Sequence, residues 1–320
     1  MSSLLSRLNP GYYQAEAVWR ASHSFGGIMR RSWKRAWVLV FAVVISLGAG
    51  AAVLFTGAPG SSAAARAPIL RALQGTGGVG GMAAAVADRT PASFVLVSPE
   101  GIKVFLDTMV VPEDLAAELS NPRNIFLASH DHADHLQPNL FQRFPGPKLR
   151  GGGQAVKEPG SVFWRAESGD VKVQAIASSH LDDLLDGNTN TIFVVEVAGV
   201  RIVHMGDCGQ TKLTPEQLQA IGHVDVMIHL LEDVLNSEAD VVNRKAYGLV
   251  AQVAPTIVIP THITTAPAVK LLDATHPAEI ATRDALVLTP NLLGGKKRAV
   301  FLGVNRDLAS KAGVGTSPDL

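Results

Sequence analysis

The stretch Ser129-His130-Asp131-His132-Ala133-Asp134-His135-Leu136 decides the fold of this chain, and it directly follows the apolar run Ile125-Phe126-Leu127-Ala128. Positions 130–135 hold three histidines and two aspartates. A surface loop gains no stability from such a cluster. Imidazole nitrogens and carboxylate oxygens are instead the ligands of zinc, iron and manganese in sites that activate water. We therefore predict a metal-binding loop, against the alternative of a chance pattern in a solvated loop.

The spacing within the loop indicates two ions. His130 and His132 are two positions apart, so in an extended segment their side chains point to the same side and can bind one ion. Asp134 and His135 follow where we expect the chain to leave the strand, so they can turn to a second ion beside the first. Two ions need more ligands than this loop supplies.

Three further candidate ligands each stand where an apolar strand ends, and active sites of layered α/β proteins gather at the ends of strands. They are His180, Asp207 and His262, which follow the strands predicted at 171–179, 200–206 and 256–261.

With these residues in order, the sequence resembles the metallo-β-lactamase superfamily from roughly Ala87 to Val304. The resemblance implies that His130, His132 and His180 hold one metal, that Asp134, His135 and His262 hold the other, and that Asp207 bridges the two. The segment His204-Met-Gly-Asp207-Cys-Gly209 is similar to the H-x-G-D-T-G of the subgroup that contains the ascorbate-6-phosphate lactonase and the N-acylphosphatidylethanolamine phospholipase D.

The sequence also departs from that subgroup at three places near the site. Thr90-Pro91-Ala92 stands for the usual Gly-His-Ala, Asp107-Thr108 for Asp-Pro, and Pro260-Thr261-His262-Ile263 for Pro-x-His-Tyr. The seven candidate ligands are intact, but the departures leave the substrate pocket unassigned. No substrate of any one member is therefore carried over.

The rest of the domain alternates strands with helices, as in an α/β protein. We expect a hairpin of strands 93–97 and 102–107, strands at 171–177, 191–197, 200–204, 224–229 and 299–302, and helices at 112–120 and 237–253. Thr214-Pro215-Glu216-Gln217 predicts a capping box with proline at the first helical position, and Gly222 is expected to end that helix. This order suits two mixed sheets packed face to face with helices outside, the αββα sandwich that the resemblance implies.

The N-terminal quarter has a different composition. Residues 36–55 are twenty consecutive uncharged positions, which as a helix would span about 30 Å, the thickness of the hydrocarbon core of a bilayer. We therefore predict a cytoplasmic segment 1–35, a transmembrane helix or signal-anchor 36–56, a flexible Gly/Ala-rich linker 57–86, a hydrolase domain 87–310 and a flexible tail 311–320. A buried core helix is the alternative for 36–55, and a short helix near 68–73 is considered within the linker.

The charges beside the apolar segment predict its orientation. Cytoplasmic flanks carry the excess of Lys and Arg, so the N-terminus is expected inside and the metal domain outside the cytoplasm. The basic residues before the segment include Arg20, Arg30, Arg31, Lys34 and Arg35, and those close behind it are Arg66 and Arg71. Because the run starting at Arg30 is similar to a twin-arginine export motif, export followed by signal cleavage remains an alternative.

The overall charge is balanced, with 28 basic and 28 acidic residues, so nucleic acid is not favoured as a partner. We expect a small-molecule or lipid substrate and contact with the membrane through the N-terminal helix, and we leave a homo-oligomer open. The lone cysteine, Cys208, stands beside Asp207, where a small supporting residue is favoured over a ligand.

Two divalent ions, zinc in preference to manganese or iron, would make a bridging hydroxide available as the nucleophile near neutral pH. Asp134 is expected both to hold metal and to accept a hydrogen bond from that hydroxide. Asp107 is read either as the partner of a ligand imidazole or as an ordinary turn aspartate. His204 is expected to support the metal loop or to be a core histidine, and His229 is considered as a proton donor to the leaving group.

These observations predict a membrane-anchored binuclear metal-dependent hydrolase acting on a phosphodiester, lactone or other ester. The alternative is a non-catalytic metal-binding or sensor module of the same fold. Redox chemistry with two irons is less favoured because no flavin-binding domain follows the metal domain, and the 204–209 segment argues against a true β-lactamase.

Overall fold

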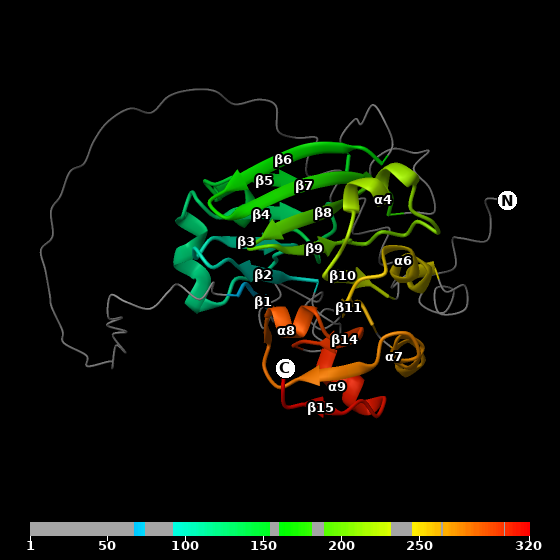
Figure 1. Cartoon of the computed structure of the whole chain (residues 1–320). Helices are drawn as coiled ribbons and strands as arrows, with labels where there is room; N and C mark the ends of the chain where they lie inside the picture. The colour runs from blue at the N-terminus through cyan, green and yellow to red at the C-terminus, as the bar shows by residue number, and fades with distance from the viewer. Residues whose placement is uncertain are drawn as a thin grey trace, which may run out of the picture. The chain divides into compact units, whose positions relative to one another are not determined.

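The computed structural model describes residues 67–73, 92–153, 160–180, 189–231, 245–263, 265–303 and 305–320. All of them fall within one compact unit, Gly60–Leu320. The strands form two sheets with helices on their outer sides (Figure 1).

The first sheet has six strands in the order β13-β1-β2-β3-β4-β5. The pairs β13–β1, β1–β2 and β2–β3 are antiparallel, whereas the pairs β3–β4 and β4–β5 are parallel. The strands are β1 (Ile69–Ala72), β2 (Phe94–Val97), β3 (Lys103–Leu106), β4 (Ile125–Ala128), β5 (Lys148–Arg150) and β13 (Ala285–Val287).

The second sheet has nine strands in the order β15-β12-β14-β11-β10-β9-β8-β7-β6. An antiparallel part, β6 to β9, continues into parallel pairs from β9 onward. The strands are β6 (Val162–Ser168), β7 (Val171–Ser178), β8 (Asn190–Val197), β9 (Val200–His204), β10 (Val226–Leu230), β11 (Ile257–Thr261), β12 (Ala278–Ala281), β14 (Arg298–Phe301) and β15 (Thr316–Ser317).

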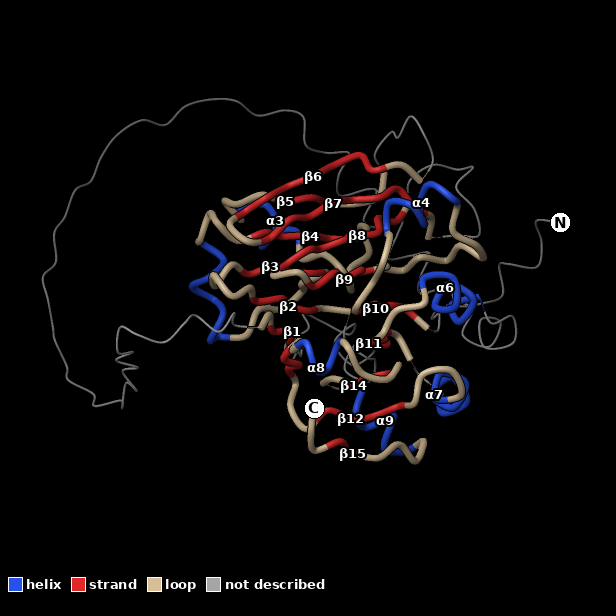
Figure 2. The backbone as a smooth tube through the Cα atoms, viewed as in Figure 1, coloured by secondary structure: helices blue, strands red, loops and turns tan. Residues whose placement is uncertain are grey.

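Helices cover the outer face of each sheet, as the blue segments on either side of the strands in Figure 2 show. The 3₁₀ helix η2 (Glu113–Ser120) and α3 (Pro138–Arg143) pack on the six-stranded sheet through an aromatic cluster that contains Phe105, Phe126 and Phe144. The nine-stranded sheet is covered by α4 (Pro215–Ile221), α6 (Lys245–Val253), α7 (Ala266–Asp273) and α9 (Asn305–Lys311). Helix α8 (Pro290–Leu293) packs at the border of the core between the sheets.

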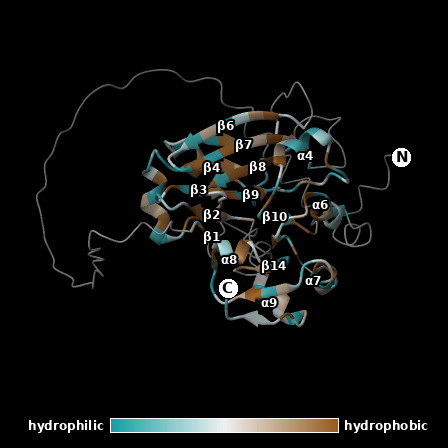
Figure 3. Ribbon diagram, in the orientation of Figure 1, coloured by the Kyte–Doolittle hydropathy of each residue, from teal (hydrophilic) through white to brown (hydrophobic). Residues whose placement is uncertain are grey.

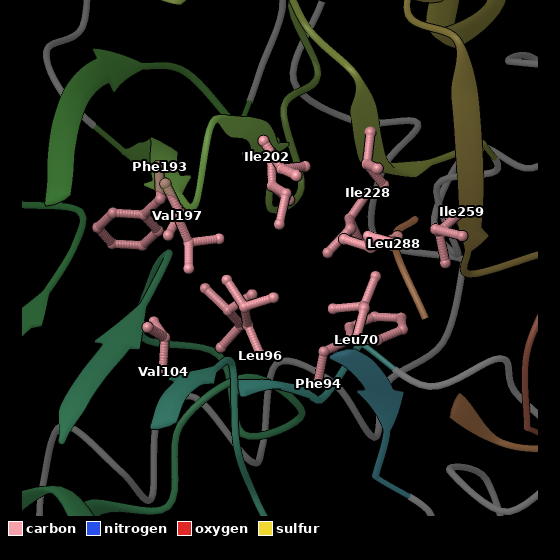
Figure 4. Close-up of a cluster of buried hydrophobic side chains, with 14 of the residues drawn as sticks. Leu70, Phe94, Leu96, Val104, Phe193, Val197, Ile202, Ile228, Ile259 and Leu288 are labelled. Carbon is pink, nitrogen blue, oxygen red and sulfur yellow. The ribbon is translucent and has the colours of Figure 1, made fainter. Parts of the chain in front are cut away.

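The main core lies between the two sheets. Because side chains alternate along a strand, every second residue of each sheet faces the other sheet, and Figure 4 shows Leu96 and Val104 opposite Phe193 and Ile202. All four are fully buried. Hydrophobic residues run along the strands of both sheets, whereas α4 carries hydrophilic ones (Figure 3). The arrangement is the predicted αββα sandwich.

Several local predictions are confirmed. Strands β2 and β3 form the expected antiparallel hairpin. The side chains of Thr214 and Gln217 complete the capping box of α4, which ends before Gly222. The predicted helix 112–120 is the 3₁₀ helix η2. Helix α6 confirms the second half of the helix predicted at 237–253, whose first residues lie outside the described part of the chain.

Two boundaries were wrong. Residues 69–72, which we predicted to be linker or a short helix, form strand β1 between β2 and β13. The predicted tail 311–320 contains β15, which pairs with β12. Both strands are short and weakly patterned, and only pairing with distant residues stabilises them.

The predicted transmembrane segment 36–56 lies outside the described residues. Among the helices that the structure describes, none has both the length and the apolar character that a bilayer-spanning segment requires.

Candidate metal centre

The His/Asp loop begins where β4 ends. Strand β4 is buried throughout, and the chain then makes a turn in which the backbone N–H groups of His135 and Leu136 both donate to the carbonyl of His132, at 3.0 and 3.1 Å. Strand β4 ends at Ala128, earlier than the point at which we expected the chain to leave the strand, and this turn then redirects the backbone after His132. Asp134 and His135 therefore project from a different part of the loop than His130 and His132.

The seven predicted ligands gather into two groups. The ligand atoms within each group all lie within 4.8 Å of one another. The first group contains His130, His132, His180 and Asp207, and the second contains Asp134, His135 and His262. Each group combines residues that follow the six-stranded sheet with residues that follow the nine-stranded sheet.

Asp207 lies between the two groups. Its Oδ2 atom is 3.6 Å from the Nε2 atoms of both His130 and His180 in its own group, and 3.2 Å from Nε2 of His135 in the other. Its Oδ1 atom is 3.7 Å from Nδ1 of His262. One carboxylate thus faces imidazoles of both groups, as a bridging ligand would.

Several ligand atoms at this centre are buried without a hydrogen-bond partner. They are Nε2 of His130, Nε2 of His135, Nδ1 of His262 and Oδ1 of Asp207. Leaving a buried polar atom unpaired costs about 1–3 kcal/mol, whereas a metal ion would satisfy these atoms. The donor set of imidazoles and carboxylates without thiolate suits zinc, manganese or iron. The cluster therefore fits a metal site.

Asp107, which directly follows β3, forms hydrogen bonds with histidines of the centre through its carboxylate. Its Oδ2 atom accepts hydrogen bonds from Nδ1 of His135 at 2.7 Å, Nε2 of His204 at 2.6 Å and the hydroxyl of Ser129 at 2.8 Å. Its Oδ1 atom accepts the Ser129 backbone N–H at 2.6 Å. Of the two readings of Asp107, the partner of a ligand imidazole is the one that the structure shows.

This network assigns the tautomers of two ligands. His135 donates from Nδ1 to Asp107, so in the neutral ring, the form that binds metal, Nε2 carries the lone pair that faces the centre. The Ser129 hydroxyl donates to Asp107 and therefore accepts from Nδ1 of His130, 2.9 Å away. Nε2 of His130 is likewise left free to bind metal.

Burial and neighbouring charges shift the pKa values of these groups in the metal-free chain. Burial lowers the pKa of His130 well below its ordinary value, and it also lowers that of His132. Burial acts in the same direction on His135, but the carboxylates of Asp207, Asp107 and Asp134 outweigh it and raise the pKa of His135 well above its ordinary value.

The pKa values of the carboxylates Asp207 and Asp107 are lowered by the neighbouring histidines. Burial alone would raise the pKa of Asp207, but His135 and His262 outweigh it, and the pKa of Asp207 lies well below its ordinary value. The pKa of Asp107 is lowered in the same way by His204 and His135. Both carboxylates are ionised at neutral pH, so Asp207 is in the form that binds metal and Asp107 is in the form that accepts hydrogen bonds.

A close approach of the two sheets holds the Asp207 loop. Gly206 has a φ of +54°, and a Cβ atom there would lie 2.5 Å from both Cβ of Ser129 and Oδ1 of Asn190. The same Oδ1 accepts the backbone N–H of Asp207 at 3.1 Å, while the Asn190 amide donates to the carbonyl of Met205 at 2.9 Å. Asn190, at the start of β8, is thus a supporting residue that the sequence did not reveal.

A buried glutamine pair holds the neighbouring loop. Gln210 and Gln217 exchange two hydrogen bonds, of 3.0 and 2.8 Å. Gln210 Oε1 also accepts the backbone N–H of Ser179, and Gln217 donates to the carbonyl of Ala177. The pair therefore connects the loop after Asp207 to the strand end that carries His180. The capping-box pattern pointed to Gln217, but nothing in the sequence pointed to Gln210.

The backbone is strained at two residues of the centre. Asp107 and His262 have φ values of 47° and 53°, in a region that residues other than glycine rarely adopt. Such strain persists only where the surrounding structure enforces it, and it clusters at functional sites.

Other candidate residues lie outside the two groups. Cys208 is buried, and burial raises its pKa to about 12, so it is a neutral thiol beside Asp207. Asp131 belongs to neither ligand group and pairs with Arg150 at the surface.

The structure does not bring His229 into the centre. Ile228, the residue before it on β10, belongs to the core between the sheets, and Met227 belongs to the core between the nine-stranded sheet and its helices. Because side chains alternate along a strand, His229 faces the helices, as Met227 does. Its side chain is fully buried, and burial lowers its pKa to about 4. This placement argues against the expected role of proton donor to a leaving group.

Comparison with known proteins gives a family. Residues 90–262, more than half of the chain, match the family described as "Beta-lactamase superfamily domain". No curated protein matches the chain.

Solved structures that match the chain include three from different organisms. A candidate Zn-dependent hydrolase of the metallo-β-lactamase superfamily from Thermotoga maritima shares 18% identity, with 73% of this chain and 98% of that chain covered and a TM-score of 0.46. CmlA, a diiron β-hydroxylase from Streptomyces venezuelae, shares 12%, with 67% and 52% covered and a TM-score of 0.40. Igni18, a metallo hydrolase from Ignicoccus hospitalis, shares 13%, with 63% and 85% covered and a TM-score of 0.39.

The family match rests on the sequence of this chain, over a range that contains all seven clustered residues. The chain belongs to the metallo-β-lactamase superfamily.

Proposed function

We propose that the protein is a binuclear metal-dependent hydrolase. The observation that carries the proposal is the position of Asp207, whose two oxygens face imidazoles of both ligand groups at 3.2–3.7 Å. A structural metal site is usually closed by four ligands around one ion. A second group of ligands that shares a carboxylate with the first would not be needed for such a structural role. Bound divalent ions supply Lewis acidity and lower the pKa of water, so that hydroxide is available as a nucleophile near neutral pH.

The burial of the residues supports catalysis over a structural role. His130, His135 and Asp207 are buried, whereas His132, His180 and Asp134 are partly exposed. The side chain of Asp134 is 28% exposed, compared with 15% for His180 and 9% for Asp207. Water and a substrate can therefore approach from the side of these three residues.

Asp134 is the residue we assign to proton handling. Its Oδ2 atom lies 3.6 Å from Nε2 of His262 and 3.9 Å from Nε2 of His135. Burial would raise the pKa of Asp134, but these histidines outweigh it, and the pKa lies below its ordinary value. Asp134 is therefore an ionised acceptor that can orient the attacking nucleophile by a hydrogen bond.

For the ions we propose zinc, with manganese or iron as alternatives, and for the substrate a phosphodiester, lactone or other ester. We also propose that the apolar segment 36–56 anchors the protein, with its catalytic domain outside the cytoplasm. The support for the anchor is the uncharged run and the basic residues that precede it. A site held near a bilayer favours a lipid or an envelope metabolite as substrate.

Metal analysis and turnover of the purified full-length chain test this function. We expect about two equivalents of zinc by mass spectrometry and EDTA-sensitive turnover on a panel of phosphodiesters, lactones, thioesters and the β-lactam nitrocefin. Asp134→Asn should reduce turnover at least hundredfold. Asp131→Asn is the matched control, because Asp131 lies in the same loop but pairs with Arg150 outside both ligand groups.

Fewer than two bound equivalents would contradict the binuclear proposal, and two equivalents without turnover on the panel would favour the sensor module. Asp134→Asn changing only stability would favour the same alternative. Turnover confined to nitrocefin would make the protein a β-lactamase.

A further inference from the structure

We infer that His204 is a positioning residue that sets the metal affinity of the second ligand group through Asp107. This inference rests on the proposed two-metal site. His204 ends β9 in the nine-stranded sheet, whereas Asp107 follows β3 in the six-stranded sheet. Nε2 of His204 lies 2.6 Å from Oδ2 of Asp107, and the two residues are 2% and 0% exposed. A short polar contact therefore joins the two sheets directly behind the metal centre.

The contact matters because the ligands come from both sheets. In the second group, Asp134 and His135 follow the six-stranded sheet, and His262 follows the nine-stranded sheet. Their separation depends on how the sheets are held together at this end. Apolar contacts between the sheets are not directional, so they do not fix the position of one sheet relative to the other. A hydrogen bond of 2.6 Å between two buried side chains is directional and does fix it at this point.

The path from His204 to the second group is direct. The Asp107 Oδ2 atom that accepts from His204 also accepts from Nδ1 of His135 at 2.7 Å. His204 therefore restricts where this oxygen lies, and the oxygen in turn orients the His135 ring. Asp107 is the direct partner of a metal-binding imidazole, and disturbing such a partner typically changes metal affinity by 10–100-fold.

The path to the first group is longer and has other supports. Asp107 is linked to His130 through the hydroxyl of Ser129. Ser129 has a support that does not involve Asp107, because its carbonyl accepts the N–H of Thr191 at 2.9 Å. Loss of His204 should therefore weaken the second group more than the first.

Zinc binding to the full-length protein at graded free zinc tests the inference. His204→Leu removes the donor, and His204→Asn shortens it, while the amide nitrogen of His204→Gln reaches about as far as Nε2 of histidine. We expect the Leu and Asn variants to bind the first equivalent like the wild type and the second 10–100-fold more weakly. The Gln variant should restore the second affinity to within about fivefold. Cobalt substitution, followed by visible absorption, gives an independent readout of the second site.

Ile202→Ala is the control for lost stability. Ile202 lies two positions earlier on the same strand, faces the same core and is fully buried. It should lower the unfolding free energy without changing either affinity, which separates a positioning effect from general destabilisation. If His204→Leu does not fold, His204→Asn answers the same question.

The inference is overturned if the Leu and Asn variants bind both equivalents like the wild type, or if Ile202→Ala weakens the second equivalent equally. It is also overturned if Gln fails to restore binding. The wild type reports on the proposed function separately, because a wild type that binds fewer than two equivalents contradicts the two-metal site itself.

Discussion

Asp207 Oδ2 lies 3.2 Å from Nε2 of His135, although the two residues belong to different ligand groups and reach the centre from different sheets. The same oxygen is 3.6 Å from His130 and from His180. The two groups are therefore not independent sites, and the loss of this one carboxylate should affect both.

Replacement of Asp207 tests this relationship. Asp207→Asn keeps the shape but removes the charge that faces four imidazoles, so we expect fewer than one bound equivalent of zinc and a loss of turnover of at least hundredfold. Metal analysis and the substrate panel measure both effects. Two equivalents bound with wild-type affinity would show that Asp207 does not bridge.

Metal removal should destabilise the fold. The ligand atoms of His130, His135, His262 and Asp207 are buried without hydrogen-bond partners, and a ligand that binds only the folded state stabilises it by about 2.7 kcal/mol at a hundredfold excess over its Kd. Thermal unfolding in EDTA should therefore occur several degrees lower than in zinc. Magnesium, which prefers oxygen ligands, is the control and should leave the midpoint unchanged.

Gly206→Ala should destabilise the protein by about 3 kcal/mol, because it combines an unfavourable positive φ with a Cβ atom inside contact distance of Ser129 and Asn190. Gly199→Ala is the matched control: its φ is +79°, but a Cβ atom there meets nothing within 4 Å. That control should cost about 1 kcal/mol. Urea unfolding measures both, and equal losses would show that the close approach of the sheets at Gly206 is unimportant.

His229 should make stability depend on pH. Its pKa is about 4 in the folded chain because burial disfavours the charged ring, and about 6.5 in the unfolded chain. As the pH falls from 7 to 4, the unfolded state binds a proton that the folded state does not, so about 3 kcal/mol of stability is lost. His229→Leu should lack this part of the pH dependence.

Urea unfolding in EDTA at pH 4, 5, 6 and 7 compares the two proteins without metal. Parallel pH profiles for wild type and variant would contradict the buried neutral state of His229. The same variant tests the proton-donor role, since a turnover loss of more than tenfold without loss of metal would restore it.

Much of the centre could be predicted because each ligand stands in a recognisable local sequence pattern. Each of the seven follows an apolar strand, and layered sheets bring strand ends together, so the sequence and the family resemblance predicted the two groups with the same members that the structure brings together. The αββα architecture followed from the order of strands and helices.

The rest depends on pairings between distant residues. The contact of His204 with Asp107 spans 97 positions and exists only once the two sheets meet. Strand β1 carries four residues in a Gly/Ala-rich region, and no local pattern marks it. His229 was misplaced because β10 extends to Leu230, and the alternation along the strand turns the His229 ring toward the helices.

The place of β1 in the six-stranded sheet has a consequence for where the chain can be shortened. A protein that begins at Ala87 would lack the strand between β2 and β13. The backbone N–H and C=O groups of both neighbours would then be left as open edges, beside the buried side chains of Phe94 and Leu96. Open edges of this kind recruit strands from other molecules. Such a fragment should aggregate, whereas one that begins before Ile69 should remain monodisperse.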